Sequence, residues 1–354
     1  AVSNYLGSKY QAISVGRVMT CVLGMVVRRE REIREFVKTP FYRVLGSFSA
    51  GGHPFDGEWR AMEGSRYFQS PYLYKENGFK EKKHAEELKA ILSANPPYKA
   101  VVEKIEKKKE NKNPPLLYNL AELQNDCSRM FKISPDETLK IVQELYEKKM
   151  VTYPRTDARV LSTAVAKEIH KNISGLRGYV HGKPFAEEIL EKGSYKNLEK
   201  TRYVNDKQIT DHYAIVPTGQ GMGALGSLHP QAAKVYETVV RRFLSIFYPP
   251  AVYQKVSIVS VIEKERLFSS FKILVSEGYL KVVQNSFAKK KDESPQEDGE
   301  QTEDTSFLEI LQTIKKGSEL DITGFQIKEG ETSPPKRYTS GSMILAMENA
   351  GQLI

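Results

Sequence analysis

The stretch Lys149-Met-Val-Thr-Tyr-Pro-Arg-Thr-Asp157 is the one around which the chain is organised. Pro154 disfavours helical geometry at the residue before it, so we expect Tyr153 to be extended. Side chains two positions apart in an extended segment project to the same side, which lets Tyr153 and Arg155 face one target. A phenol oxygen beside a permanent, forked cation suits attack on a phosphodiester, because the cation offsets charge that develops on the phosphoryl oxygens. The stretch therefore predicts a nucleophile and its phosphate partner.

Capped helices are predicted on both sides of this stretch. Asn119-Leu-Ala-Glu122 and Ser134-Pro-Asp-Glu137 are typical helix starts, and Ser162 can cap a third helix. Helix, helix, short extended turn and helix are typical of winged-helix packing. The same residues are thus compatible with a non-enzymatic winged-helix DNA-binding protein in which Tyr153 packs in an ordinary turn.

The composition indicates a soluble globular protein with an anionic partner. Its 354 residues exceed one ordinary core and predict two to three domains. Lys and Arg number 53 against 44 Asp and Glu, and the net charge of +9 favours nucleic acid as that partner. The 2 cysteines exclude a disulfide framework and a four-cysteine zinc module, and they fit a reducing cytoplasm.

The chain has no recognisable targeting or membrane segment. No apolar run is long enough to span a bilayer, and the first residues lack the pattern of a signal peptide. The opening Ala1-Val-Ser-Asn4 has no start methionine, so we expect a fragment or a processed chain. We therefore expect no membrane partner.

Before the tyrosine stretch, the sequence predicts a long helix followed by strands. The helix covers residues 14–36, and at its entrance Ser14-Val-Gly-Arg17 offers backbone donors to a phosphate. Residues 41–62 and 98–107 have β patterns. The lysine-rich run 107–112 is expected to be a solvated linker, although its charge is also compatible with binding nucleic acid.

After a helical block over about 116–248, the β pattern returns. The strands expected there are 252–261, 268–275, 279–283, 308–314 and 320–327. The acidic stretch 289–305 has almost no apolar residues and predicts a loop. Residues 343–349 predict a last helix.

This order predicts a multidomain α and β fold in which insertions are nested. A mainly helical, winged-helix-like domain with Tyr153 is inserted into a β domain, which is itself inserted into a helical domain, and the whole forms an arch. The expected parts are 1–39 (helical domain, first part), 40–113 (β arch domain, first part), 114–249 (helical domain with the tyrosine), 250–332 (β arch domain, second part) and 333–354 (helical domain, return segment).

A second informative stretch is Val204-Asn-Asp-Lys-Gln-Ile-Thr-Asp-His-Tyr-Ala-Ile-Val-Pro-Thr218. A histidine such as His212 can donate a hydrogen bond to a phosphodiester or shuttle a proton near neutral pH. It is equally compatible with a structural histidine tied to the backbone or to Asp211. The other five of the 6 histidines lack ligand-like spacing, and no Asp-x-Asp-x-Glu cluster is present, so we expect no metal site in this chain.

Together these motifs resemble those of type IA DNA topoisomerases, most closely the bacterial topoisomerase III branch, over nearly the whole chain. The stretches that carry the resemblance are Ser14–Thr20, Val26–Glu30, Pro115–Gln124, Thr152–Asp157, Asp211–Thr218, Pro334–Thr339 and Ala346–Gly351. The first two match the helix that follows the Toprim domain in that family, and the last two match the segment that returns to the first helical domain.

The resemblance implies a mechanism. Tyr153 attacks single-stranded DNA and forms a 5′-phosphotyrosyl link, another strand passes, and the break is rejoined without ATP, which relaxes negative supercoils or decatenates DNA. Arg155 binds the phosphate and His212 lies at the site. The DNA-binding residues that the resemblance implies are Ser14, Arg17, Thr20, Asp157, Asp211, Arg337 and Thr339.

The resemblance also implies a magnesium ion, whose acidic ligands belong to a Toprim domain that is not recognisable in this sequence. We therefore expect the isolated chain to bind no cofactor and to be catalytically incomplete. The expected partners are single-stranded DNA and negatively supercoiled or catenated DNA, bound by a monomer in the bacterial cytoplasm. Three residues depart from the family pattern: Met19 replaces a glutamine, Tyr213 a second histidine and Ser340 a glutamate.

Overall fold

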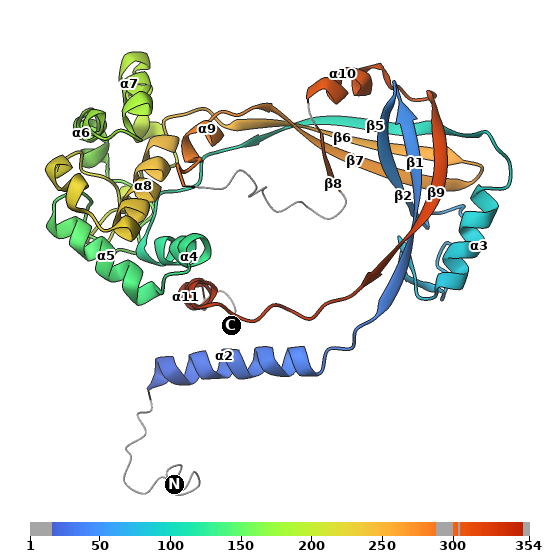
Figure 1. Cartoon of the computed structure of the whole chain (residues 1–354), viewed down its shortest axis with the longest axis horizontal. Helices are drawn as coiled ribbons and strands as arrows, with labels where there is room; N and C mark the ends of the chain where they lie inside the picture. The colour runs from blue at the N-terminus through green and yellow to red at the C-terminus, as the bar shows by residue number, and fades with distance from the viewer. Residues whose placement is uncertain (1–15, 288–299, 304, 350–354) are drawn as a thin grey trace, which may run out of the picture.

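The computed structural model describes residues 16–287, 300–303 and 305–349, and these elements form an arch (Figure 1). A block of helices lies at one end and a β-sheet at the other. The long strands β5 (Tyr98–Lys112), β6 (Ala251–Ile262) and β7 (Glu265–Ser276) connect the two ends on one side. On the other side, the chain returns from the sheet to α11 (Ser340–Glu348), which packs against the helical block.

Six of the strands close into an antiparallel barrel. Their order is β2-β7-β6-β5-β9-β1, and β1 (Pro40–Ala50) pairs again with β2 (His53–Arg60). The strand β9 (Glu319–Glu331) lies between β5 and β1. Closure satisfies the backbone groups that an edge strand would leave unpaired. The tight turn between β1 and β2 contains Gly51 and Gly52, whose φ angles of 56° and 81° suit glycine.

Aromatic side chains fill the barrel. The rings of Phe48 and Phe55 stack with centroids 5.1 Å apart, and Phe271 meets Phe55 edge-on at 5.3 Å. The helix α10 (Thr305–Thr313) adds Phe307, which is fully buried and lies 5.2 Å from Phe271. The helix α3 (Lys82–Leu92) covers another part of the same core with the buried Leu88.

The helical block forms a second core. Its main helices are α4 (Leu120–Phe131), α5 (Pro135–Glu147), α6 (Thr163–Gly175), α7 (Lys183–Lys192) and α8 (Pro230–Ser245). The predicted caps of three of them are confirmed, because the side chains of Asn119, Ser134 and Ser162 each accept a hydrogen bond from a backbone N–H three residues on. The helix α8 is the most buried of the five and lies at the centre of this core.

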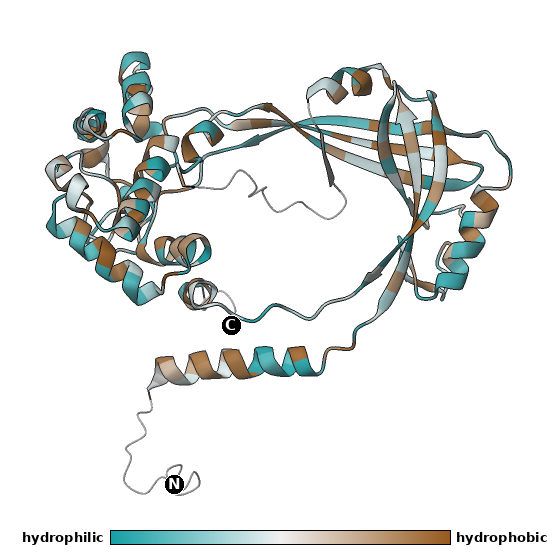
Figure 2. Ribbon diagram, in the orientation of Figure 1, coloured by the Kyte–Doolittle hydropathy of each residue, from teal (hydrophilic) through white to brown (hydrophobic). Residues whose placement is uncertain are grey.

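The remaining elements are short, apart from α2. They are α2 (Arg17–Arg34), α9 (Leu280–Val283), β3 (Leu73–Lys75), β4 (Gly78–Phe79), β8 (Glu300–Glu303), η1 (Leu176–Gly178), η2 (Leu198–Lys200), η3 (Asp206–Gln208) and η4 (Met222–Ser227). The helix α2 exposes apolar residues in its first half, as the brown segments in Figure 2 show, and Leu23 is 63% exposed. In the part of the chain that the structure describes, no helix has the length and apolar character to cross a membrane.

Four local predictions were wrong. The lysine-rich run 107–112 is no linker but the second half of β5, paired with β6 along its whole length. Lysine is common on exposed edge strands because it prevents pairing with other chains, so a run that resembles a solvated linker also fits such an edge. Residues 279–283 contain the helical turn α9 and residues 308–314 mostly belong to α10. Short apolar runs do not distinguish a strand from a buried helix, and Phe307 and Leu311 have helical spacing.

The acidic stretch 289–305 is only partly described. Its residues 300–303 form β8, parallel to β7, and Thr305 begins α10, so the loop prediction was wrong for this part. The remainder of the stretch lies outside the described residues. Strands that precede the helical block in the sequence pair with strands that follow it, and all belong to one sheet. The division of the chain into nested domains stays a prediction.

The barrel core makes a prediction about stability. Phe48→Ala should lower the free energy of unfolding by about 3–5 kcal/mol, because it removes a buried aromatic ring and leaves a cavity. Trp59, the single tryptophan, is buried in this core, and its fluorescence during urea unfolding reports on the barrel. Val37→Ala is the control: this side chain is 79% exposed, and the change should be within about 0.5 kcal/mol. Equal effects of the two substitutions would contradict the assigned core.

Candidate active site

Two segments far apart in the sequence run side by side in the helical block. We call residues 149–157 the tyrosine loop and residues 211–218 the histidine segment. An antiparallel bridge joins Val151 to Pro217, and the amide of Thr152 donates to the carbonyl of Val216 at 3.0 Å. The two stretches that the sequence singled out are therefore in direct contact.

Two threonines of the tyrosine loop bind the histidine segment on either side of Tyr153. The hydroxyl of Thr152 donates to the carbonyl of Ala214 and accepts from the amide of Val216, both at 2.9 Å. The hydroxyl of Thr156 donates to the carbonyl of His212 at 3.0 Å. Both threonines thus use their side chains where a regular sheet would use its backbone, and they fix the short Tyr-Pro-Arg stretch between them.

This arrangement brings the predicted nucleophile and the predicted histidine together. The rings of Tyr153 and His212 have centroids 4.3 Å apart, inclined by 41°. Tyr146 of α5 meets the ring of Tyr153 edge-on, with centroids 5.5 Å apart. Tyr153 is half-buried, whereas His212 is exposed. The phenol hydroxyl of Tyr153 and the imidazole of His212 have no hydrogen-bond partner within residues 16–287, 300–303 and 305–349, so both are open to a ligand.

Arg155 and the two predicted aspartates are close in sequence to Tyr153 and His212. Arg155, Asp157 and Asp211 are exposed. Within the described residues, no ion pair engages the Arg155 guanidinium, and no contact joins it to either ring. The structure therefore places Arg155 on the right loop and leaves its guanidinium available for a phosphate. Tyr213, where the family has a second histidine, is half-buried, and this burial raises the pKa of its phenol.

Two of the other predicted DNA-binding residues, Arg17 and Thr20, belong to α2. Thr20 donates its hydroxyl to the carbonyl of Gly16 on α2, at 3.0 Å, which is a local helical contact. Ser14 lies outside the described residues, and Arg17 is the first residue of α2. The sequence prediction for these three residues is not tested by the structure.

Arg337 and Thr339 lie in the first part of the predicted return segment, before α11. Arg337 forms a two-pronged ion pair with Glu30 of α2, with distances of 2.6 and 3.0 Å. Thr339 caps α11, because its hydroxyl accepts from the amide of Ser342 at 3.1 Å. Both residues border a cavity of about 750 Å³. The basic side chains that line this cavity are Arg29, Arg129, Lys132, Lys336 and Arg337.

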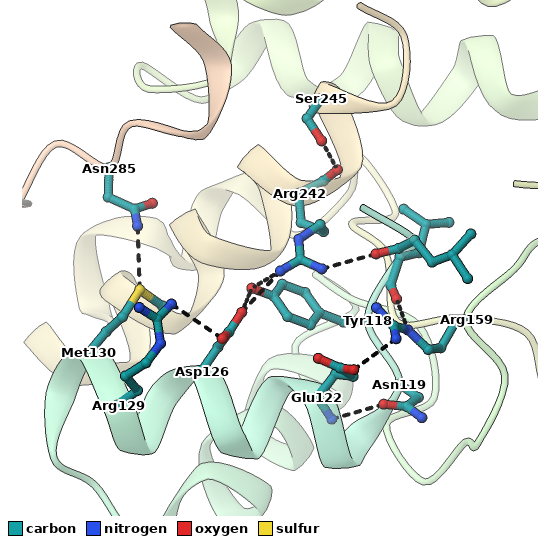
Figure 3. Close-up of polar contacts among 12 residues, drawn as sticks. Tyr118, Asn119, Glu122, Asp126, Arg129, Met130, Arg159, Arg242, Ser245 and Asn285 are labelled. Atoms are coloured by element: carbon teal, nitrogen blue, oxygen red, sulfur yellow. Dashed lines mark hydrogen bonds and ion pairs between the residues drawn. The ribbon is translucent and has the colours of Figure 1, made fainter. Parts of the chain in front are cut away.

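A polar network of Tyr118, Asp126 and Arg242, which no sequence motif predicted, lies between α4 and α8 (Figure 3). The phenol of Tyr118 donates to Asp126 at 2.6 Å, and Arg242 of α8 donates to both Tyr118 and Asp126 at 3.0 Å. Burial raises the pKa of Tyr118 well above its ordinary value, with Asp126 adding to the shift and the Arg242 charge opposing it. Tyr118 is therefore a buried, neutral phenol with a structural role. Tyr153 differs from it in being only half-buried.

The backbone next to Tyr118 holds both segments of the site. The carbonyl of Tyr118 accepts from the amide of Ile215 at 2.8 Å, and the amide of Leu120 donates to the carbonyl of Thr156 at 3.1 Å. Arg159 follows the tyrosine loop and pairs with Glu122 of α4 at 2.7 Å (Figure 3). The sequence predicted the capped helix start at Asn119–Glu122 but none of these contacts, because their partners are distant along the chain.

Magnesium, which the resemblance implies, does not fit the residues described. Within that part of the chain, no group of three or more His, Cys, Asp or Glu side chains is placed to hold a metal ion. Glu122, the carboxylate of α4 behind the tyrosine loop, is already paired with Arg159. The chemistry below therefore uses no metal held by these residues.

The threonine contacts make a testable prediction. Thr152→Val keeps the shape of the side chain but removes the acceptor of the Val216 amide, so this amide should exchange with solvent at least about tenfold faster. Thr152→Ser retains the hydroxyl and should keep the protection. Hydrogen exchange followed by NMR measures both. Equal protection of Val216 in the two variants would show that the hydroxyl does not hold the histidine segment.

Comparisons with known proteins identify the family of this chain. The sequence profile of the DNA topoisomerase family matches residues 1–351. DNA topoisomerase 3 of Bacillus licheniformis is 30% identical over 349 residues, which are 97% of this chain and 43% of that protein. DNA topoisomerase 3 of Shouchella clausii is 31% identical over 351 residues, which are 98% of this chain and 43% of that protein. The chain thus spans about two-fifths of the length of the curated relatives it matches.

A solved structure shares the fold. Full-length topoisomerase I from Thermotoga maritima superposes with a TM-score of 0.65 at 22% identity, covering 96% of this chain and 49% of that one. At this identity the likeness concerns the fold, including its combination of a closed barrel and helices. The match of the family profile over nearly every residue shows that this chain belongs to the DNA topoisomerase family, in its type IA branch, and that it is similar to bacterial DNA topoisomerase 3.

Proposed function

We propose that this chain carries the nucleophile of a topoisomerase III-like enzyme that cuts and rejoins single-stranded DNA. The observation that supports this most is the placement of Tyr153. Its phenol is accessible, its ring lies 4.3 Å from that of His212, and its loop is bound by threonines on both sides. A packed turn residue would need neither an accessible hydroxyl nor this fixed position.

The proposed chemistry is a transesterification. The oxygen of Tyr153 attacks a phosphorus atom of the DNA backbone, a 5′-phosphotyrosyl bond forms, and the bond to the 3′ oxygen breaks to leave a 3′-hydroxyl. The reverse reaction rejoins the strand, and because the ester conserves the bond, ATP is not needed. Between the two steps, passage of another strand relaxes negative supercoils or decatenates DNA.

Two side chains assist in this proposal. A tyrosine has a pKa of about 10 in water, so its proton must be removed and the charge at phosphorus balanced for attack near neutral pH. Arg155, two residues from Tyr153, offers a forked donor to the phosphoryl oxygens. His212 can hydrogen-bond a phosphate or the 3′ oxygen from its position beside the phenol.

The cavity beside the return segment is the proposed path of the DNA backbone toward this site. Its lining combines the start of α11 with basic side chains from α2, α4 and the return segment, including Arg337. Phosphates are attracted to such a surface, which supports single-stranded DNA as the ligand. We propose that the magnesium ligands lie outside this chain and that the protein acts as a monomer in the bacterial cytoplasm.

The central prediction concerns a covalent adduct. The gene product that contains this chain should become attached to a single-stranded oligonucleotide labelled at its 3′ end, and peptide mapping should place the adduct on Tyr153. Tyr153→Phe should abolish the adduct because it removes the attacking oxygen. Tyr146→Phe is the matched control, since Tyr146 touches the same ring and is 39% exposed. An adduct on another residue, or an adduct that persists in Tyr153→Phe, would disprove the assignment.

A second prediction concerns the chain on its own. The 354-residue chain should bind single-stranded DNA weakly and should not relax a negatively supercoiled plasmid, because it holds no metal site among its described residues. Gel analysis of plasmid topoisomers, with and without added magnesium, measures this. Relaxation that Tyr153→Phe abolishes would show that the chain is catalytically complete. A preference for duplex DNA would instead favour a winged-helix DNA-binding protein.

A further inference from the structure

The arch is closed on its lower side by one helix pair. The helix α11 packs against α4 of the helical block (Figure 1). Gly341 makes this approach possible, because a β-carbon there would lie only 2.9 Å from the α-carbon of Asn125. This contact joins the chain that leaves β9 to the helical block, so we expect closure of the arch on this side to depend on it.

A single buried side chain joins this contact to the tyrosine loop. Asn119 is 1% exposed, and its carbonyl oxygen accepts from the amide of Glu122 at 2.9 Å to cap α4. Its amide nitrogen donates to the backbone carbonyl of Asp157 at 3.2 Å and to the carboxylate of Glu348 on α11 at 2.5 Å. One carboxamide therefore contacts the start of α4, the end of the tyrosine loop and the closing helix.

We infer that Asn119 is a positioning residue that couples the docking of α11, and hence closure of the arch, to the geometry of the loop that carries Tyr153. The inference rests on the proposed function only in that it gives the coupling a purpose, which is to hold the nucleophile in place while the arch is closed. The contacts themselves do not depend on it. If α11 leaves α4, the amide of Asn119 loses its charged acceptor, and the constraint on Asp157 changes with it.

The charges around Glu348 make this contact sensitive to pH. Burial raises the pKa of the Glu348 carboxyl; its hydrogen bond from Asn119 opposes the shift, and the nearby charges of Glu122 and Asp157 add to it. Arg159 also opposes the shift. Although Glu348 as a whole is exposed, its carboxylate is partly desolvated where it meets Asn119. Docking of α11 thus brings the carboxylate of Glu348 toward those of Glu122 and Asp157 and toward the guanidinium of Arg159.

The sign of the pH effect follows from the raised pKa. A carboxyl whose pKa is higher in the closed arch binds its proton more tightly there, so acid favours closure. Closure is weakened as the pH rises through the raised pKa of Glu348, because the ionised carboxylate is repelled by Glu122 and Asp157. A neutral Glu348 still accepts the Asn119 hydrogen bond through its carbonyl oxygen.

Three substitutions separate the contributions. Asn119→Ser keeps an oxygen that caps α4 but removes the amide donor. Asn119→Asp also keeps the cap and places a carboxylate against Glu348. Glu348→Gln keeps the acceptor and removes the charge, so it imitates the protonated acid. The cap is preserved in each Asn119 variant, and folding of α4 should be retained.

Closure can be measured by electron spin resonance distances between labels on α5 and α11. Lys140→Cys and Ser340→Cys provide exposed positions, in a Cys21→Ser background; Cys127 is buried and should not react. The open-to-closed ratio should rise on the order of tenfold in Asn119→Ser and further in Asn119→Asp. The unsubstituted pair should open as the pH rises, whereas Glu348→Gln should stay closed.

The loop is followed separately, by the ¹⁹F resonance of 3-fluorotyrosine at position 153. In the unsubstituted protein, one component of its pH titration should match the change in distance, and this component should vanish in Glu348→Gln. Unchanged distances in both Asn119 variants would refute the closure part of the inference. A resonance that does not follow the distance would refute the coupling.

Neither measurement uses DNA or cleavage. The outcome is therefore distinguishable from failure of the proposed function, which is decided by the covalent adduct on Tyr153. An adduct on Tyr153 together with insensitive distances would leave the enzyme assignment intact and remove only the role of Asn119.

Discussion

The antiparallel pairing of β5 with β6 is the interaction on which the rest of the structure depends. It runs from Val101 opposite Val261 to Lys112 opposite Ala251, so the chain enters and leaves the helical block at one point. The two strands thereby belong both to the closed barrel and to the arm that carries the block. The position of the block relative to the barrel is therefore set by contacts of different strength: the β5–β6 ladder, the packing of α9 after β7 against α8, and a small helix pair between α11 and α4.

Within the block, side chains of one segment of the site hydrogen-bond to the backbone of the other. Thr152 and Thr156 hold the histidine segment, and the residues around Tyr118 hold both segments in turn. Each such hydrogen bond contributes about 1 kcal/mol net, but leaving a buried partner unpaired costs about 1–3 kcal/mol. Displacement of either segment would leave several partners unpaired at once. The nucleophile can therefore be accessible and still have a fixed position.

Local chemistry made part of this arrangement predictable. Pro154 and the Asp-His pair singled out the two stretches with Tyr153 and His212, whose rings the structure places side by side, while the catalytic roles of these residues and of Arg155 stay predictions. The caps at Asn119, Ser134 and Ser162 were confirmed, because a capping side chain bonds a backbone group only three residues away. Closure of the barrel was not predicted, because pairing between β1 and β9 depends on contacts across most of the chain. The supporting roles of Arg242 and Arg159 were missed because neither residue has a local signature.

The two polar networks differ in the way that the proposed opening of the arch would require, with one part that stays together and one that separates. Tyr118 is buried, and the partly buried Arg242 and Asp126 pair with it and with each other, so separating them would leave desolvated polar groups without partners, at a cost of about 1–3 kcal/mol each. Glu348 instead brings a carboxylate toward Glu122 and Asp157, and its contact with Asn119 is opposed by that repulsion. The network behind the nucleophile is therefore the strong one, and the contact that closes the arch is the weak one. If instead the Asn119–Glu348 contact were the stronger and the Tyr118 network the weaker, the loop with Tyr153 would lose its position before the arch opened.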